Sequence, residues 1–134
     1  MAGPVGVLYE AVITRLGDPS ITAAGATGVY NKIAPASAAL PFIIVQWQGG
    51  GDENDNPKRA RNSLFTVQAL AEVQDDADAI DAACDVLLHK QTLTVPGWTN
   101  FLTAREGDVD DQEVDELGRP IFHAGGTYRI RIAK

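Results

Sequence analysis

Alternating apolar residues predict a long β-strand in the middle of the chain, beginning at Arg61. One face of this strand is entirely apolar, whereas the other face mixes leucines with polar side chains. Because a sheet with one apolar face needs a covering layer, we expect a helix to pack against it. The predicted apolar face consists of Phe65, Val67, Ala69, Ala71 and Val73.

The predicted cover is a helix that follows the strand, from Asp75 to His89. Its apolar residues recur at spacings of four, three and one, which places them on one stripe of an α-helix. Aspartates at its start and a histidine and a lysine at its end suit the helix dipole. The stripe consists of Ile80, Cys84, Leu87 and Leu88, and the opposite face carries Asp78, Asp81, Asp85 and His89.

The remaining segments add a second helix and further strands. Apolar spacing from Val5 to Leu16 predicts an amphipathic helix that ends near Gly17. Small residues from 20 to 28 predict a connection without regular structure. Further strands are expected at 29–33, 41–48, 98–105, 120–123 and 127–132, with a break at Gly125-Gly126.

Together these elements predict one α+β domain over residues 1–134, an antiparallel β-sheet packed with two amphipathic helices. The core expected between the sheet and the second helix contains Val45, Phe65, Val67, Ile80 and Leu87.

Two polar stretches stand out between the apolar segments. Residues 49–62 begin with three glycines and continue with acids and then bases, which predicts a hairpin loop about twice the usual length. Such a stretch is either a functional arm or a disordered tip. The second stretch, from Gly107 to Gly118, carries six acidic residues.

Composition and charge narrow the functional classes. The net charge of -7 argues against a protein that grips nucleic-acid phosphates, which needs clustered Lys and Arg. A single cysteine excludes an internal disulfide and fits a reducing compartment. The N-terminus lacks the pattern of a secretory signal, and the longest apolar run, Ala38 to Val45, is too short to cross a bilayer. We therefore expect a soluble cytoplasmic product without a membrane partner.

Candidate chemistry is sparse. Cys84 lies on the apolar helix stripe, where a thiol is structural and inert, and His89 and His123 carry no metal spacing. The residues 52–56 offer the oxygens of a calcium loop, but Pro57 stands where an EF-hand needs glycine. A loose divalent site on the second acidic stretch stays open. The sequence thus predicts no enzyme activity, no catalytic residues and no cofactor.

The order of segments resembles a known family. The run Val29–Pro35 followed by Ala39–Val45 is similar to the tail-terminator (tail-completion) family of tailed bacteriophages. The segments Asp75–Leu88 and Gly126–Ile132 also look like that family, and the similarity in order and length extends over nearly the whole chain.

This resemblance implies a structural virion protein in the tail neck, made in the host cytoplasm. Members form a ring, typically of six subunits, at the head-proximal end of the tail tube. The ring stops polymerisation of the tail-tube protein and docks onto the head connector. The genomic DNA passes through its channel without specific binding. The implied fold is an α+β sandwich related to the tube protein.

The ring gives the polar stretches two expected roles. The loop is predicted to reach a neighbouring subunit, with segregated charges that set the register of a closed ring. The acids are predicted to face the channel and to repel phosphate, with a solvated outer face as the alternative. The contact residues expected are Trp47, Asp52, Glu53, Asp55, Lys58, Arg59 and Arg61. The channel-facing acids expected are Asp78, Asp81, Asp85, Asp108, Asp110, Asp111, Glu113, Asp115 and Glu116.

Other interpretations remain at the level of the sequence. One is another neck protein of similar architecture, such as a head-completion protein or a connector adaptor. A second, from a different class, is a small ligand-binding or regulatory α+β domain. A hydrolase with a composite site ranks last, because no nucleophile motif is present.

Overall fold

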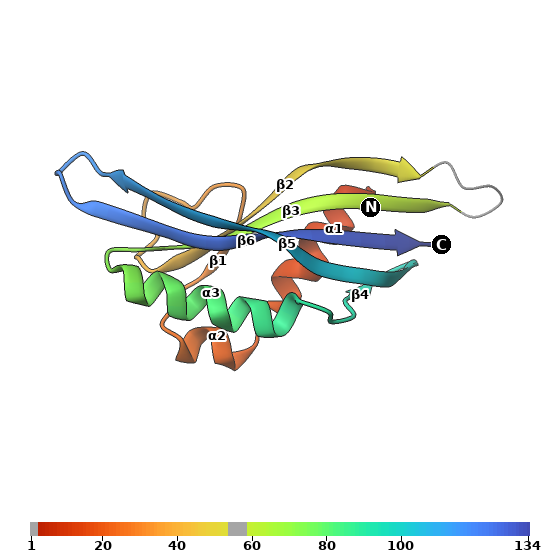
Figure 1. Cartoon of the computed structure of the whole chain (residues 1–134), viewed down its shortest axis with the longest axis horizontal. Coiled ribbons are helices and arrows are strands. Elements are labelled where there is room, and N and C mark those ends of the chain that lie inside the picture. The colour runs from red at the N-terminus through yellow and green to blue at the C-terminus, as the bar shows by residue number, and fades with distance from the viewer. Residues whose placement is uncertain (1–2, 54–58) are drawn as a thin grey trace.

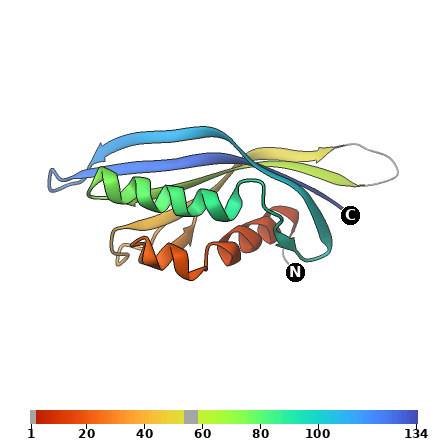
Figure 2. The ribbon, with the colours of Figure 1, turned by 60° about the horizontal axis from the view of Figure 1, so that its bottom comes forward.

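Three helices lie on one face of a six-stranded sheet in the computed structural model, which describes residues 3–53 and 59–134 (Figures 1 and 2). The helices are α1 (Pro4–Arg15), α2 (Pro19–Ala23) and α3 (Gln74–Leu88). The strands are β1 (Val29–Asn31), β2 (Phe42–Glu53), β3 (Ala60–Ala71), β4 (Thr94–Val95), β5 (Trp98–Val114) and β6 (Pro120–Ala133).

The sheet has the strand order β1-β2-β3-β6-β5-β4. Antiparallel pairing was predicted throughout, and this is wrong at one edge, where β1 pairs with β2 in the parallel sense. The cause is the connection between them, because residues 32–41 carry the chain back to the level at which β1 began. Every other neighbouring pair among the described strands is antiparallel.

The predicted central strand and its covering helix are confirmed as β3 and α3. The stripe of α3 and the apolar face of β3 are buried against each other, as are all five predicted core residues. Val73 is the exception on the strand face, because it is 51% exposed and caps the start of α3. The strand ends at Ala71, since the chain must turn there to lay the helix on the sheet.

The first predicted helix is confirmed as α1, but the following connection contains a helix that the sequence reading missed. Asp18 accepts a hydrogen bond from the backbone N–H of Ser20, and Pro19 fills the first helical position. These two features start α2, which buries Ile21. The domain therefore has three helices instead of two.

The predicted hairpin loop at 49–62 is wrong, because most of it is strand. Gly49 pairs with Leu64 and Glu53 pairs with Ala60, so the ladder continues through the glycines after a bulge at Gln48. Gly50 has a φ of 124°, and a Cβ there would lie 2.0 Å from the carbonyl oxygen of Asn62. Glycine is present to let two strands approach, which a loop prediction cannot anticipate.

The predicted break at Gly125-Gly126 is also wrong, because β6 runs through it without interruption. A Cβ on Gly125 would lie 2.2 Å from the carbonyl oxygen of Val67 on β3. A Cβ on Gly126 would lie 2.7 Å from the Nε atom of Arg105. Both glycines therefore mark close packing by neighbours, and the chain does not turn there.

Strand β5 continues beyond Arg105 to Val114, so much of the acidic stretch is also strand. With β6 it forms a long hairpin at one end of the molecule, and β2 and β3 form another at the opposite end (Figure 1).

Candidate assembly surfaces

The face of the sheet opposite the helices is uncovered within the described part of the chain (Figure 2). Strand alternation places half-buried apolar side chains on it beside charged ones. The apolar ones are Tyr30, Phe42, Leu64, Leu70 and Leu102. A broad open face of this kind is a surface for another molecule to cover.

Charges on this open face are paired within the chain. The guanidinium of Arg129 binds Glu106 at 2.9 Å, and that hydrogen bond holds the pKa of the Glu106 carboxyl below its ordinary value. Arg131 binds Glu53 at 2.7 Å and lowers the pKa of Glu53 in the same way. Among the described residues, polar and apolar side chains therefore alternate on the open face, without a cluster of basic groups for phosphate.

Two strand edges are free in the part of the chain that the structure describes, and they lie at opposite ends of the sheet. On the outer side of β2, β1 pairs only at Ile43, Ile44 and Val45, and the Trp47 N–H donates to the hydroxyl of Tyr9. On the outer side of β5, β4 pairs at Trp98 and Thr99. The end of α3 then occupies that side, because Lys90 N–H bonds to the Thr103 carbonyl and Arg105 N–H bonds to His89 Nδ1.

Beyond these contacts, β2 from residue 49 to 53 and β5 from residue 107 to 114 have no strand beside them in the described chain. Unpaired strand edges present rows of backbone donors and acceptors, which another chain can pair with.

The residues predicted to contact a neighbouring subunit already have partners in the chain. Asp52 binds Arg61 at 2.8 Å and Arg59 at 3.3 Å, and the hydrogen bond from Arg59 is the main cause of the lowered pKa of Asp52. Trp47 lies half-buried on the helix-covered face. Asp55 and Lys58 fall outside the described residues. The intersubunit role of this set stays a prediction.

The helix pattern predicted that the aspartates of α3 lie on a free outer face. The structure shows that not all of them do. Asp81 binds Arg105 at 2.8 Å, and Asp85 lies 3.6 Å from the same guanidinium. Asp85 also accepts a hydrogen bond from the hydroxyl of Tyr128 at 2.9 Å. Only Asp78 of the three is exposed. Arg105 on β5 turns the other two toward the sheet.

Arg105 is the centre of a network that the sequence reading missed. Its guanidinium also donates to the Gly125 carbonyl at 2.7 Å and to Asp108 at 2.9 Å. The hydrogen bond to Asp81 raises the pKa of Arg105, and burial raises the pKa of the Tyr128 hydroxyl. The network ties α3, β5 and β6 together. The sequence held two signals for this network. One was an arginine at the end of a predicted strand, and the other was a pair of glycines in a later strand.

His89 also contributes to this network. Asp85 and His89 lie four residues apart on the helix, a spacing that allows a weak surface pair. Instead, His89 accepts the backbone N–H of Arg105 on its Nδ1 atom, 3.0 Å away, and so anchors the end of α3 to β5.

The acids of the second stretch divide into paired and free groups. Asp108 binds Arg105, Glu113 lies 2.9 Å from His123 Nε2, and Asp115 binds Arg119 at 2.8 Å. The remaining exposed acids of the stretch are Asp110, Asp111 and Glu116. Whether these acids face a channel stays a prediction.

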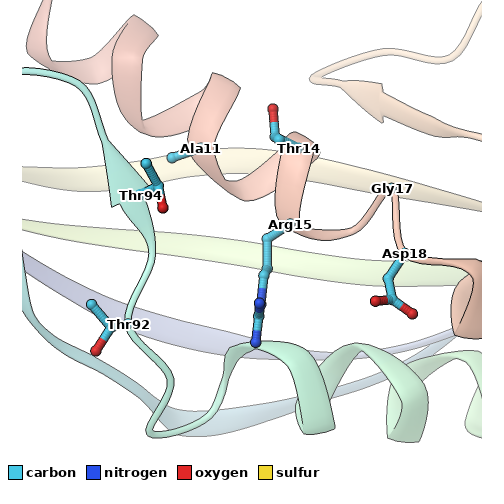
Figure 3. A pocket seen from close by; sticks show the side chains of 7 residues that line it. All are labelled: Ala11, Thr14, Arg15, Gly17, Asp18, Thr92 and Thr94. Atoms are coloured by element: carbon cyan, nitrogen blue, oxygen red, sulfur yellow. The ribbon is translucent and has the colours of Figure 1, made fainter.

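The cavities in the described part of the chain are open to solvent. The charged side chains that line one of them have structural roles. A cavity of about 300 Å³ lies between the end of α1 and residues 92–94 (Figure 3). Arg15 extends from it toward α3 and donates to the Leu87 carbonyl at 2.9 Å, while Asp18 caps α2. Both charged groups in this cavity therefore already serve the ends of helices.

Three further observations concern chemistry and environment. Cys84 is buried, and burial raises the pKa of its thiol to about 12. Within residues 3–53 and 59–134, no group of three potential metal ligands is clustered. In the same residues, no helix combines the length and apolar character that crossing a bilayer requires.

Comparison with known proteins gives a match in structure only. No family model and no curated protein matches the sequence. The fold is similar to that of a chain in the "Virion of native gene transfer agent (GTA) particle", with a TM-score of 0.80 and 18% sequence identity. The similarity covers 100% of both chains. The chain therefore shares the whole fold of a component of a phage-like particle.

Proposed function

We propose that this chain is a structural virion protein, a tail terminator that forms a ring at the head-proximal end of a tail tube. The observation that carries the proposal is the full-length structural similarity to a chain of a gene transfer agent virion. It agrees with the resemblance of the sequence to the tail-terminator family.

The assembly surfaces support a role within a multisubunit particle. An uncovered sheet face and two free strand edges make an isolated monomer prone to aggregate. They suit a subunit whose neighbours cover that face and pair with those edges. The free edges differ from each other, so a contact between them is heterologous and can close a ring.

The charge of the chain supports a conduit for DNA in place of a DNA-binding protein. The net charge is -7, and the arginines of the open face are held by carboxylates. A wall of this kind repels phosphate within about 8 Å at physiological salt, so a genome passes without being held.

The proposed partners are the tail-tube protein on one side of the ring and the head connector on the other. Electron microscopy of the chain mixed with its tail-tube protein tests this. We expect a ring at one end of each tube and a halt to tube growth. Tubes that elongate as they do without the chain would refute the terminator role.

The same experiment separates the alternatives. Binding to isolated portal rings in the absence of tubes would favour a connector adaptor or head-completion protein. A monomer that ignores tubes and portals and saturates with a small metabolite would favour a ligand-binding domain.

A further inference from the structure

We infer that neighbouring copies of this chain join edge to edge, the free part of β2 in one copy pairing with the free part of β5 in the next. This inference deepens the proposed ring and rests on it. It specifies the occupant of each free edge as a second copy of the chain.

Strand polarity favours this pairing. Within one chain, β2 is antiparallel to β3, β3 to β6, and β6 to β5, so β2 and β5 run in opposite directions. Rotation about a common axis keeps the strand directions around the ring and brings β5 of one copy beside β2 of the next. The two edges then meet as antiparallel strands, and the sheet continues from copy to copy.

The positions of the free edges require an offset between neighbours. Through β3, residues 49–53 of β2 are level with residues 129–133 of β6. Residues 107–114 of β5 are paired with residues 120–127 of β6. At about 3.3 Å per residue, the two free edges lie about 25 Å apart along the strands. Each copy must therefore shift by about 25 Å against its neighbour, which tilts the strands relative to the ring axis, as in a closed barrel.

The same offset brings exposed apolar residues together. Leu117, at the tip of the β5–β6 hairpin, is 78% exposed, and Val114 beside it is 63% exposed. Shifted by this offset, the tip reaches the level of Val45 on the neighbour, where β1 ends. Ile33 follows β1 there and is 81% exposed.

Charge is complementary where the hairpin tip meets the end of the neighbour's β1. Along the paired strands both sides carry acids, and those of β2 are held by Arg61 and Arg131 of their own chain. Lys32 adjoins Ile33 on the neighbour, and its N–H bonds to the Val45 carbonyl, which fixes it at the end of β1. The exposed carboxylate of Glu116 comes from the hairpin tip. Burial of Leu117 and Ile33 provides the larger stabilisation, because an exposed ion pair contributes at most about 1 kcal/mol.

Proline substitutions can block each edge separately. The Trp47 N–H points away from β3, and Asp52 points the same way because their partners Phe65 and Arg61 are four residues apart on β3. Asp52→Pro therefore removes an outward donor of β2 without breaking the internal ladder.

The matching variant for the other edge is Asp110→Pro. The Arg105 N–H points away from β6, and the partners of Arg105 and Asp110 on β6, Tyr128 and Ala124, are also four residues apart. Asp110→Pro removes an outward donor of β5 in the same way. Asp52→Ala and Asp110→Ala, which keep the N–H, serve as matched controls.

Native mass spectrometry over a range of protein concentrations tests the inference. We expect each proline variant alone to self-associate at least about tenfold more weakly than the parent, since one strand of every contact is blocked. An equimolar mixture should form a heterodimer and nothing larger, because each partner supplies one intact edge. A proline variant that still forms homodimers as tightly as the parent, or a parent that stays monomeric at its solubility limit, would overturn the inference.

Two serine variants keep the test decisive if a proline variant does not fold. Leu117→Ser and Ile33→Ser should each weaken self-association about tenfold. Val86→Ser is the control, because Val86 is 74% exposed on α3 and belongs to neither strand edge. Equal weakening by all three variants, or by none, would refute the contact. Tube capping is not part of this readout, so failure here is distinct from failure of the terminator proposal.

Discussion

Single residues decide how closely the elements of this domain approach each other. Gly125 and Gly126 leave space for β3 and for the guanidinium of Arg105, which binds Asp81 from that position. A partly buried ion pair that shares hydrogen bonds is costly to leave half-made, so these residues depend on each other. The Arg105 network and the glycine pair form one structural unit.

The closeness of β3 to β6 gives a prediction for Gly125→Ala. Its Cβ would meet the Val67 carbonyl oxygen at 2.2 Å, so we expect a loss of about 1–3 kcal/mol in the free energy of unfolding. Gly107→Ala is the control on β5, because its Cβ would have its nearest neighbour at 3.9 Å. Chemical denaturation of both variants measures the difference, and equal stability would contradict the close packing.

The pair of Arg129 and Glu106 predicts a pH-dependent contribution. The folded-state pKa of Glu106 is lowered by Arg129, so its stabilisation is present above the ordinary value of 4.5 and is lost as pH falls through the folded pKa. We expect Arg129→Gln to be less stable than the parent near pH 7, and the gap to narrow below about pH 4. The hydrogen bond of Arg129 to Asn62 leaves a part of the gap that is independent of pH. Urea titrations at several pH values measure it, and a constant gap would argue against the pair.

At the scale of elements, α3 is the cover that the sheet requires. Leu87 lies on its buried stripe, and Leu87→Ala should cost about 2–5 kcal/mol if the cavity stays open. Val86→Ala, on the exposed side of the same helix, should cost less than about 0.5 kcal/mol. Similar losses for the two variants would mean that the helix face is assigned wrongly.

The elements were predictable from sequence where periodicity alone determines them. The alternation in β3 and the spacing in α3 gave the strand, the helix and their shared core. Glycine gave the wrong answer twice, at 49–51 and at 125–126, because local propensity treats it as a turn former. A Cβ at Gly50 or Gly125 would meet the backbone of a neighbouring strand, and a Cβ at Gly126 would meet the side chain of Arg105. These are tertiary effects.

The assembly surfaces were less predictable for the same reason. The sequence shows that charges exist at 52–61 and at 108–116, but only the fold shows which of them are paired. Asp52 with Arg61 and Asp81 with Arg105 are contacts between separate elements. The parallel pairing of β1 likewise depends on where the loop at 32–41 returns the chain.

At the scale of the whole molecule, the free acids predict an effect on DNA transit. Reversal of Asp110, Asp111 and Glu116 to lysine should make a ring that holds DNA, if these groups face the channel. Particles that carry the reversed chain should package or eject DNA less well than the parent. Replacement by asparagine and glutamine removes the repulsion without adding attraction and serves as the control. Normal infectivity after reversal would exclude a channel-facing role.

The acidic side chains along the free edge of β5 have a further consequence for handling the protein. An open strand edge seeds fibres when nothing repels a second identical edge. The exposed side chains of Asp108, Asp110, Asp111 and Glu113 lie along this edge and repel another copy of it. That protection weakens as the carboxylates gain protons, and the chain carries no net charge near its pI of 4.6. Concentrated solutions brought slowly to this pH should therefore form thioflavin-positive fibres before they form an amorphous precipitate.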